Sequence, residues 1–191
     1  MLIPECVPEL AARVLASEPR CGRSRLVCID GPAGSGKSTL AAALARAVGA
    51  VPVIHMDDLY EGWEQPLGDH LAGRIDAWLL TPWKSGLAGQ HPRYDWVQAR
   101  FCEWIEVPAA PVVILEGCAS ATEGIRERAS LVVWVEAPVA LRLERGLDRD
   151  GDELQAQWLT WQEREAAHFA ADNTRAAADV RVDGRTGRIG S

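Results

Sequence analysis

Eight consecutive residues in the first quarter of the chain could bind phosphate. They are Gly31-Pro32-Ala33-Gly34-Ser35-Gly36-Lys37-Ser38, which fit the pattern G-x-x-x-x-G-K-[ST] and are followed by Thr39. Glycines let the backbone turn its N–H groups toward a phosphate, and a helix beginning here adds a partial positive charge. In such a loop the lysine, here Lys37, reaches the β- and γ-phosphates, and the hydroxyl of Ser38 holds Mg²⁺. The pattern predicts a nucleoside triphosphate site over residues 31–39 rather than a glycine-rich turn that binds nothing.

Acidic residues follow two apolar runs that we expect to be strands. Asp57 and Asp58 come directly after residues 51–56, and Glu116 follows residues 111–115. In an open parallel sheet, ligands bind beyond the carboxyl ends of the strands. A kinase needs one carboxylate to accept the proton of the acceptor hydroxyl and another to help order Mg²⁺. Asp57 and Glu116 fit these two roles, whereas capping a turn is an equally good interpretation of Asp58.

Three arginines recur at helical spacing in the C-terminal half. Arg142, Arg145 and Arg149 stand at i, i+3 and i+7, which places them along one side of a helix. They could form a lid whose guanidinium groups close over the transferred phosphoryl group, or a solvated stripe paired with Glu144 and Asp148. The lid is favoured for Arg145 and Arg149, and for Arg142 both interpretations stay open.

Strands and helices alternate along most of the chain, which predicts an α/β fold with a parallel sheet. Expected strands cover residues 25–30, 51–56, 111–115, 131–135 and 178–182, and expected helices cover 5–17, 39–48, 122–129, 139–149 and 152–169. Residues 59–110 are less regular, with a helix over 67–80 and a hairpin that pairs 94–97 with 104–107. Such an insertion is a usual place for an acceptor substrate. Four tryptophans of the insertion could line an apolar pocket, although packing is the commoner role: Trp63, Trp78, Trp83 and Trp96. Outside the insertion, Trp134 is expected in the core.

Composition excludes several classes of function. A length of 191 residues suits a single domain, and a net charge of −7 argues against binding to a nucleic-acid backbone. No apolar run is long enough to span a membrane, and no basic stretch leads into an apolar one at the N-terminus. The five cysteines are odd in number and lack C-x-x-C spacing, which favours neither a disulfide framework nor a zinc site. We therefore expect a cytoplasmic protein with a small-molecule partner, in an oligomeric state that the sequence leaves open.

The order of these segments resembles the uridine kinase family of P-loop kinases, which includes nicotinamide riboside kinases and phosphoribulokinase. The resemblance runs over residues 25–183 and rests on six segments: GPAGSGKST at 31–39, IHMDDLY at 54–60, HPRYDW at 91–96, VVILEG at 112–117, RLERGLDRD at 142–150 and HFAADNTRAAADVRV at 168–182. Two departures are Leu59, where the family usually has an aromatic residue, and Gly151-Asp152-Glu153, where it usually has Glu-Arg-Gly. The insertion does not match residues that recognise uridine.

The resemblance implies a fold and a set of roles. The fold is a P-loop NTPase of three α/β/α layers, with five parallel strands in the order 2-3-1-4-5. The single domain, residues 1–191, would comprise a core at 25–58 and 111–183, an acceptor-binding insertion at 59–110 and an arginine lid at 142–155. The implied roles are the general base for Asp57, acceptor contacts for Tyr94 and Asp95 (the latter on a sugar hydroxyl), Mg²⁺ for Glu116, and the lid for Arg145 and Arg149. Asp57, Asp58, Tyr60 and Arg142 are also expected to contact the acceptor.

These observations predict an ATP- and Mg²⁺-dependent kinase of a small molecule. The favoured acceptor is the 5′-hydroxyl of a nucleoside or similar riboside, and the nearest alternative is a non-nucleoside alcohol. ATP is preferred to GTP because the chain has no guanine-reading N-K-x-D segment. The rival prediction is a nucleotide-dependent switch that hydrolyses ATP slowly and phosphorylates nothing.

Overall fold

Continuous apolar runs form the strands of the central sheet. The computed structural model describes residues 5–64 and 66–190. The strands of this sheet are β1 (Arg25–Asp30), β2 (Val53–His55), β5 (Val112–Glu116), β6 (Ala129–Glu136), β7 (Val180–Asp183) and β8 (Arg188–Ile189). They stand side by side in the order β2-β5-β1-β6-β7-β8. The first five are parallel and, numbered among themselves along the chain, have the order 2-3-1-4-5.

The sheet has six strands where five are expected. The sixth, β8, pairs antiparallel with β7 at the edge of the sheet. The chain reverses between them because the carboxylate of Asp183 accepts the backbone N–H of Arg185 at 2.8 Å, and Gly187 N–H donates to Asp183 O at 2.7 Å. This tight turn lies in the Gly- and Arg-rich tail, which has too few apolar residues to be recognised as a strand.

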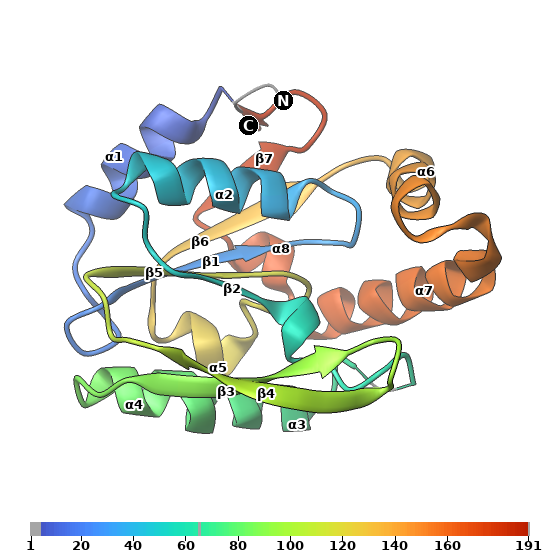
Figure 1. The fold of residues 1–191 in the computed structure, drawn as a ribbon. Helices are drawn as coiled ribbons and strands as arrows, with labels where there is room; N and C mark the ends of the chain where they lie inside the picture. Colours follow the sequence, from blue (N-terminus) through green and yellow to red (C-terminus); the bar gives the residue numbers. More distant parts are fainter. Residues whose placement is uncertain (1–4, 65, 191) are drawn as a thin grey trace.

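Helices cover both faces of the sheet and one of its ends (Figure 1). On one face lie α1 (Val7–Ala16) and α2 (Lys37–Ala47), and on the other lie α3 (Asp69–Ile75), α4 (Thr81–Lys84), α5 (Glu123–Arg126) and α8 (Thr174–Ala177). We call the segment that joins β1 to α2, residues 31–36, together with the start of α2, the phosphate loop. At the end of the sheet where this loop enters α2 stand α6 (Val139–Asp150) and α7 (Gln155–Asp172). Three short turns complete the described elements: η1 (Met56–Asp58), η2 (Asp76–Leu80, a π-helical turn) and η3 (Asp152–Leu154).

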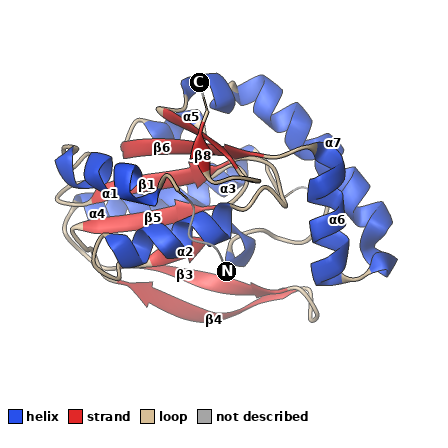
Figure 2. Ribbon diagram, turned by 90° about the horizontal axis from the view of Figure 1, so that it is seen from above, coloured by secondary structure: helices blue, strands red, loops and turns tan. Residues whose placement is uncertain are grey.

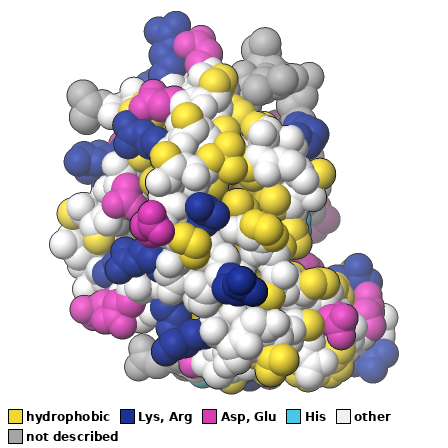
Figure 3. Space-filling view, turned by 90° about the vertical axis from the view of Figure 1, so that its left-hand side faces the viewer, with side chains coloured by type: hydrophobic (Ala, Val, Ile, Leu, Met, Phe, Trp, Pro, Cys, Tyr) yellow, Lys and Arg dark blue, Asp and Glu magenta, His cyan; other side chains and the backbone are white. Residues whose placement is uncertain are grey.

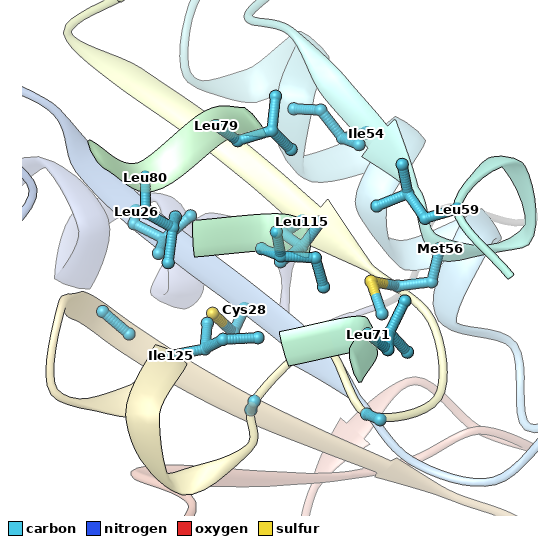
Figure 4. Close-up of a cluster of buried hydrophobic side chains, with 14 of the residues drawn as sticks. Leu26, Cys28, Ile54, Met56, Leu59, Leu71, Leu79, Leu80, Leu115 and Ile125 are labelled. Carbon is cyan, nitrogen blue, oxygen red and sulfur yellow. The ribbon is translucent and has the colours of Figure 1, made fainter. Parts of the chain in front are cut away.

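Two hydrophobic clusters hold these layers together, one on each face of the sheet. Strand β1 contributes to both, since side chains alternate across a strand. Val27 and Ile29 pack with α1 and α2, while Leu26 and Cys28 pack with the elements of the opposite face (Figure 4). As expected, Trp134 of β6 is buried, and its ring lies 4.7 Å from that of Phe169.

The C-terminal part of the insertion forms a separate two-stranded ribbon, which follows α3, η2 and α4 (Figure 2). Strands β3 (Gly89–Asp95) and β4 (Arg100–Val107) pair so that Tyr94 faces Phe101, and the predicted pairing of 94–97 with 104–107 is wrong. Trp96 and Val97 lie in the turn instead. The cause is the carboxylate of Asp95, which accepts the backbone N–H groups of Val97 at 2.9 Å and Gln98 at 2.8 Å.

The surface seen from the side opposite α6 and α7 mixes both signs of charge. Figure 3 shows basic and acidic side chains interspersed around a band of hydrophobic ones. Within the described ranges, no helix is long and apolar enough to cross a membrane. All five cysteines are free thiols.

Candidate functional site

The phosphate loop joins β1 to α2 in a conformation that needs glycine. Gly31 has φ +136°, and a Cβ there would lie 2.1 Å from the carbonyl oxygen of Val135 on β6. Gly34 has φ +76°, and a Cβ there would lie 2.5 Å from the carbonyl oxygen of Arg142 on α6. Both contacts are far below van der Waals distance, so the loop sits tightly against β6 and α6 and keeps its curvature.

Backbone N–H groups of this loop have no acceptor. Among the described residues, no hydrogen bond is made by the N–H groups of Gly34, Gly36, Lys37, Ser38 or Thr39, and the first paired donor of the helix is Leu40 N, 3.1 Å from Gly36 O. All five residues line the same cavity. Unpaired donors at a helix N-terminus are suited to an anion, and their convergence here fits a polyphosphate.

Lys37 adds a positive charge within the loop. Its ammonium group donates to Pro32 O at 2.9 Å, and its side chain is buried but lines the cavity. Burial alone would lower the pKa of Lys37, but the acidic groups around it, Cys118 and Glu116 foremost, outweigh burial and raise that pKa. The ammonium therefore stays charged at neutral pH. It also donates a long hydrogen bond to Cys118 Sγ at 3.8 Å, which leaves one of its three protons for a ligand.

Two carboxylates reach the same cavity from neighbouring strands. Because β2 pairs with β5, His55 lies opposite Glu116, and Asp57 follows in the turn η1. The imidazole of His55 lies 2.5 Å from the carboxylate of Glu116, and this hydrogen bond raises the pKa of His55. The cavity walls partly remove Asp57 from solvent and so raise its pKa; the negative charge of Glu116 acts in the same direction. Lys37 and Arg149 oppose this rise.

The cavity has a volume of about 900 Å³. It is bounded by the phosphate loop and the start of α2, by η1 and the segment after it, by the turn between β3 and β4, by the end of β5, and by α6 and α7. Its lining residues are Ala33, Gly34, Gly36, Lys37, Ser38, Thr39, Asp57, Asp58, Trp63, Trp96, Val97, Glu116, Gly117, Cys118, Arg145, Gly146, Arg149, Asp150, Leu154, Trp158 and Trp161. Gly31, Pro32 and Ser35 belong to the loop but not to the lining.

Two of the three helical arginines line the cavity. Arg145 donates to Gly34 O at 3.1 Å and to Gly184 O at 3.2 Å, so it connects α6 to the phosphate loop. Arg149 pairs with Asp150 at 2.7 Å, and its guanidinium lies 5.7 Å from the ring centre of Trp158. Among the ion pairs of the described residues, neither arginine pairs with Glu144 or Asp148.

Four predicted contacts to the acceptor lie outside the cavity. Tyr60 is buried in the core, where its hydroxyl donates to Cys118 O at 2.8 Å. Tyr94 is buried against Trp96, with 5.3 Å between ring centres, and Asp95 holds the hairpin turn described above. Arg142 is also buried, which rules out the solvated stripe for this residue. The phenol and carboxylate types are right for a sugar, but in this structure the hydrogen-bonding groups of Tyr60, Asp95 and Arg142 contact other groups of the protein.

Glu165 of α7 carries no sequence motif, yet it supports the phosphate loop. Its carboxylate is 1% exposed and pairs with Arg142 at 2.5 Å. It also accepts the N–H of Ala33 at 2.8 Å and the indole N–H of Trp161 at 3.1 Å. Trp158, Trp161 and Glu165 stand at i, i+3 and i+7, and this spacing is the signal that places Glu165 on the inner face of its helix.

Asp30 is a second buried acid beneath the loop. Its carboxylate accepts the backbone N–H groups of Gly31 at 2.6 Å, Ala119 at 3.0 Å and Ala121 at 2.8 Å. Complete burial raises the pKa of Asp30 to about 7, although these hydrogen bonds and Lys37 oppose the rise. It ends strand β1, and the rule that singled out acids at strand ends applies to it as well.

Tryptophans of the insertion divide between the cavity and the core. Trp63 and Trp96 line the cavity. Trp83 is buried and donates to Val107 O at 3.0 Å, and Trp78 packs on Trp104 with 5.6 Å between ring centres. The indoles of Trp158 and Trp161 on α7 complete the cavity wall.

The residues present fit Mg²⁺ only together with a phosphate ligand. In the part of the chain that the structure describes, no group of three or more His, Cys, Asp or Glu side chains is arranged as a metal site. The exposed hydroxyl of Ser38 and the carboxylate of Glu116 nevertheless line the same cavity. Mg²⁺ is commonly held by one or two protein oxygens, with phosphates and water as its other ligands.

Comparison with known proteins assigns a family to this arrangement. The chain is 31% identical to the uridine kinase of Deinococcus deserti over 146 residues, which cover 69% of this chain and 70% of that enzyme. The chain belongs to the uridine kinase family. No family model matches the sequence.

Two further matches differ in what they cover. A possible uridine kinase of Bacillus stearothermophilus superposes with a TM-score of 0.68 at 20% identity, over 92% of this chain and 96% of that one, and shows the same fold. A match of 45% identity over 58 residues covers 24% of this chain but only 12% of a bifunctional pantoate ligase/cytidylate kinase of Synechococcus sp.. The uridine kinase relatives support a kinase, with a phosphate-binding loop at the carboxyl ends of a mostly parallel sheet.

Proposed function

We propose that this kinase transfers the γ-phosphoryl group of ATP to an alcohol, the hydroxyl of a nucleoside, a riboside or a similar small molecule. One observation carries the proposal. Lys37 and the unpaired N–H groups of the phosphate loop line the same cavity as the carboxylate of Asp57. A triphosphate site and a proton acceptor thus face one space, as direct transfer between two bound substrates requires.

The phosphate loop binds and orients the nucleotide in this proposal. The N–H groups of residues 34 and 36–39 hold the phosphates, and Lys37 balances charge on the β- and γ-phosphates. Ser38 and Glu116 would hold Mg²⁺, which when bound supplies further positive charge to the phosphates. Residues 59–110 then form the acceptor-binding insertion, and residues 142–155 form the lid within the same domain.

Asp57 orients the acceptor and takes its proton. The hydroxyl oxygen forms a bond to the γ-phosphorus while the bond from that phosphorus to the β,γ-bridging oxygen breaks, and ADP leaves. The hydroxyl proton passes to the carboxylate of Asp57, whose raised pKa makes it a better base than an ordinary aspartate. Arg149, which lines the cavity from α6, compensates negative charge as the phosphoryl group moves.

ADP release measured with and without acceptors tests this proposal. The panel should contain nucleosides, ribosides and simple alcohols, each with ATP and Mg²⁺ and again with GTP. Acceptor-stimulated release of ADP, matched by an equal amount of phosphorylated acceptor, is the expected result. A low rate of hydrolysis that no member of the panel changes would favour a nucleotide-dependent switch instead.

A further inference from the structure

A second cavity lies at the β7–β8 edge of the sheet, and we call it the edge cavity. Its volume is about 410 Å³, which is within the range of cavities that bind small molecules. It is bounded by the end of β6, the start of α6, α8, β7 and the turn that follows β7. Its lining residues are Glu136, Ala137, Pro138, Arg175, Arg181, Val182, Asp183, Arg185 and Gly190. None of them lines the cavity of the phosphate loop.

Three arginines from different elements line the edge cavity. Arg175 is on α8, Arg181 is on β7, and Arg185 is in the turn after β7. A guanidinium presents its N–H donors in a planar fork that matches the oxygens of a carboxylate or a phosphate. A planar carboxylate is satisfied by one such fork, whereas a tetrahedral phosphate has oxygens for several. Three guanidinium groups around one space are therefore best suited to a phosphate.

The two acids of the edge cavity are already paired. Glu136 pairs with Arg175 at 2.7 Å, and Asp183 pairs with Arg185 at 2.6 Å. These hydrogen bonds lower the pKa of both carboxyl groups, that of Asp183 to about 2, so both acids are ionised at neutral pH. Each pair uses Nε and Nη2 of its arginine. Among the described residues, Nη1 of Arg175 and of Arg185 makes no hydrogen bond, so each remains a donor for a ligand.

Arg181 supplies the charge that no acid balances. The side chains of Val180 and Val182 pack in the cluster with α1 and α2, so that of Arg181 lies on the opposite face of β7. It is half-buried, and within the described part of the chain it makes no ion pair and no side-chain hydrogen bond. A charge that is partly removed from water without a partner costs free energy, which an anionic ligand would offset.

The turn that carries Arg185 also contacts the phosphate loop. Gly184 precedes Arg185, and a Cβ on it would lie 1.8 Å from Ser35 O. The carbonyl of Gly184 accepts the guanidinium of Arg145 at 3.2 Å, and its N–H donates to Glu136 O at 2.8 Å. A ligand that binds this arrangement of the turn therefore favours the contacts that hold the phosphate loop and Arg145 in place.

We propose that the edge cavity binds a small phosphate-bearing molecule as an effector. The phosphate contacts Arg175, Arg181 and Arg185, and its binding strengthens nucleotide binding at the phosphate loop. The rest of the lining is small and apolar, which leaves room for the organic part of a phosphate ester: Ala137, Pro138, Val182 and Gly190. Free phosphate offers the arginines the same chemistry, and the experiment separates the two sources.

Four probes separate the charge, the shape and the source of the ligand. Glucose 6-phosphate is compared with glucuronate, which has a carboxylate at the same end of the sugar, with neutral glucose, and with inorganic phosphate. Binding is measured by calorimetry on the whole protein, with the phosphate loop saturated by Mg²⁺ and a non-hydrolysable ATP analogue. We expect a phosphate probe to bind about ten-fold more tightly than glucuronate or glucose. Tighter binding of the ester than of inorganic phosphate identifies an ester as the ligand, and the reverse identifies free phosphate.

Variants connect this binding to the edge cavity. Arg181→Gln removes no ion pair and should weaken binding of the phosphate probe about ten-fold. Arg175→Gln, at an exposed position on α8, is a second variant with the same expected direction. The control is Arg46→Gln, which removes the same charge from the exposed end of α2, outside both cavities, and should change nothing. Circular dichroism verifies that each variant is folded.

Titration of the ATP analogue with and without the phosphate probe tests the effector role. The probe should tighten binding of the analogue about five-fold in the wild-type protein, and should have no effect in Arg181→Gln. Without the probe, this variant should bind the analogue as the wild-type protein does.

Four outcomes would overturn the inference. They are binding of neither phosphate probe, equally tight binding of glucuronate, phosphate binding that survives Arg181→Gln, and an affinity for the analogue that does not respond to the probe. Phosphoryl transfer is measured separately as ADP release with an acceptor. Failure of this inference therefore leaves the kinase function intact, and absence of ADP release leaves the effector site intact.

Discussion

Replacing Glu165 by glutamine removes one charge from the contact between the phosphate loop and helix α7. Both oxygens of this carboxylate face donors, Arg142 on one side and the N–H groups of Ala33 and Trp161 on the other. A glutamine of the same shape must turn its NH₂ group toward one of these donors, whichever way it is oriented. Glu165→Gln therefore leaves a buried guanidinium without its counter-charge and at least one donor unpaired.

The structure sets the size of this effect. The side chains of Arg142 and Glu165 are 8% and 1% exposed, so little water can replace the lost partner. Removing one partner of such a buried pair costs about 3–5 kcal/mol of unfolding free energy. With a urea m-value of roughly 2 kcal/mol per molar for a protein of this size, the midpoint should fall by about 2 M.

Urea unfolding followed by tryptophan fluorescence measures this shift. Glu163→Gln is the matched control, since Glu163 is exposed on the same helix and its change should cost less than about 0.5 kcal/mol. Binding of an ATP analogue should weaken in Glu165→Gln, because Ala33 loses its support, and should not change in the control. A midpoint for Glu165→Gln within about 0.5 M of the wild-type protein would refute this account of the loop.

Three further predictions concern stability, the loop and the lid. Burial raises the pKa of Asp30 from 3.8 to about 7, so its contribution to stability is complete below about pH 4 and is lost as pH rises through 7. This fall is roughly 4 kcal/mol, and urea midpoints should show it in the wild-type protein but not in Asp30→Asn. Gly34→Ala should abolish binding of an ATP analogue, since its Cβ would lie 2.5 Å from Arg142 O, while Gly124→Ala, with open space around it, should bind normally by the same titration. Arg149→Gln should lower kcat about a hundredfold with little change in nucleotide affinity, and an unchanged kcat would remove this residue from the lid.

Hydrophobic pattern was sufficient for most of the central sheet. Strand β5 is apolar up to its last residue, Glu116, and fully buried, and β1 and β6 are nearly as apolar and buried, which makes them recognisable without knowledge of their neighbours. The hairpin was misassigned because Trp96 and Val97 have high β-propensity, although the side chain of Asp95 forces them into the turn. Strand β8 is only two residues long and has no pattern to read.

In the candidate site, motif spacing predicts the position of those residues that directly follow a strand, because the course of the backbone determines where they lie. The phosphate loop, Asp57 and Glu116 all lie at carboxyl ends of strands, and topology alone brings them to one edge of the sheet. Tyr60 and Arg142 are near cavity-lining residues in the sequence, but both side chains are buried, where they contact Cys118 O and Glu165. Long-range partners such as Glu165, 132 residues from Ala33, cannot be inferred from local spacing.

The most direct test of the central claim compares Asp57→Asn with the wild-type protein, using whichever acceptor stimulates ADP release. Nucleotide affinity and acceptor-dependent turnover are measured on the same preparations. If the phosphate loop and Asp57 act on substrates in one cavity, the variant binds the ATP analogue almost as tightly and turns over at least ~100-fold more slowly. A variant that phosphorylates the acceptor at the wild-type rate would contradict the account.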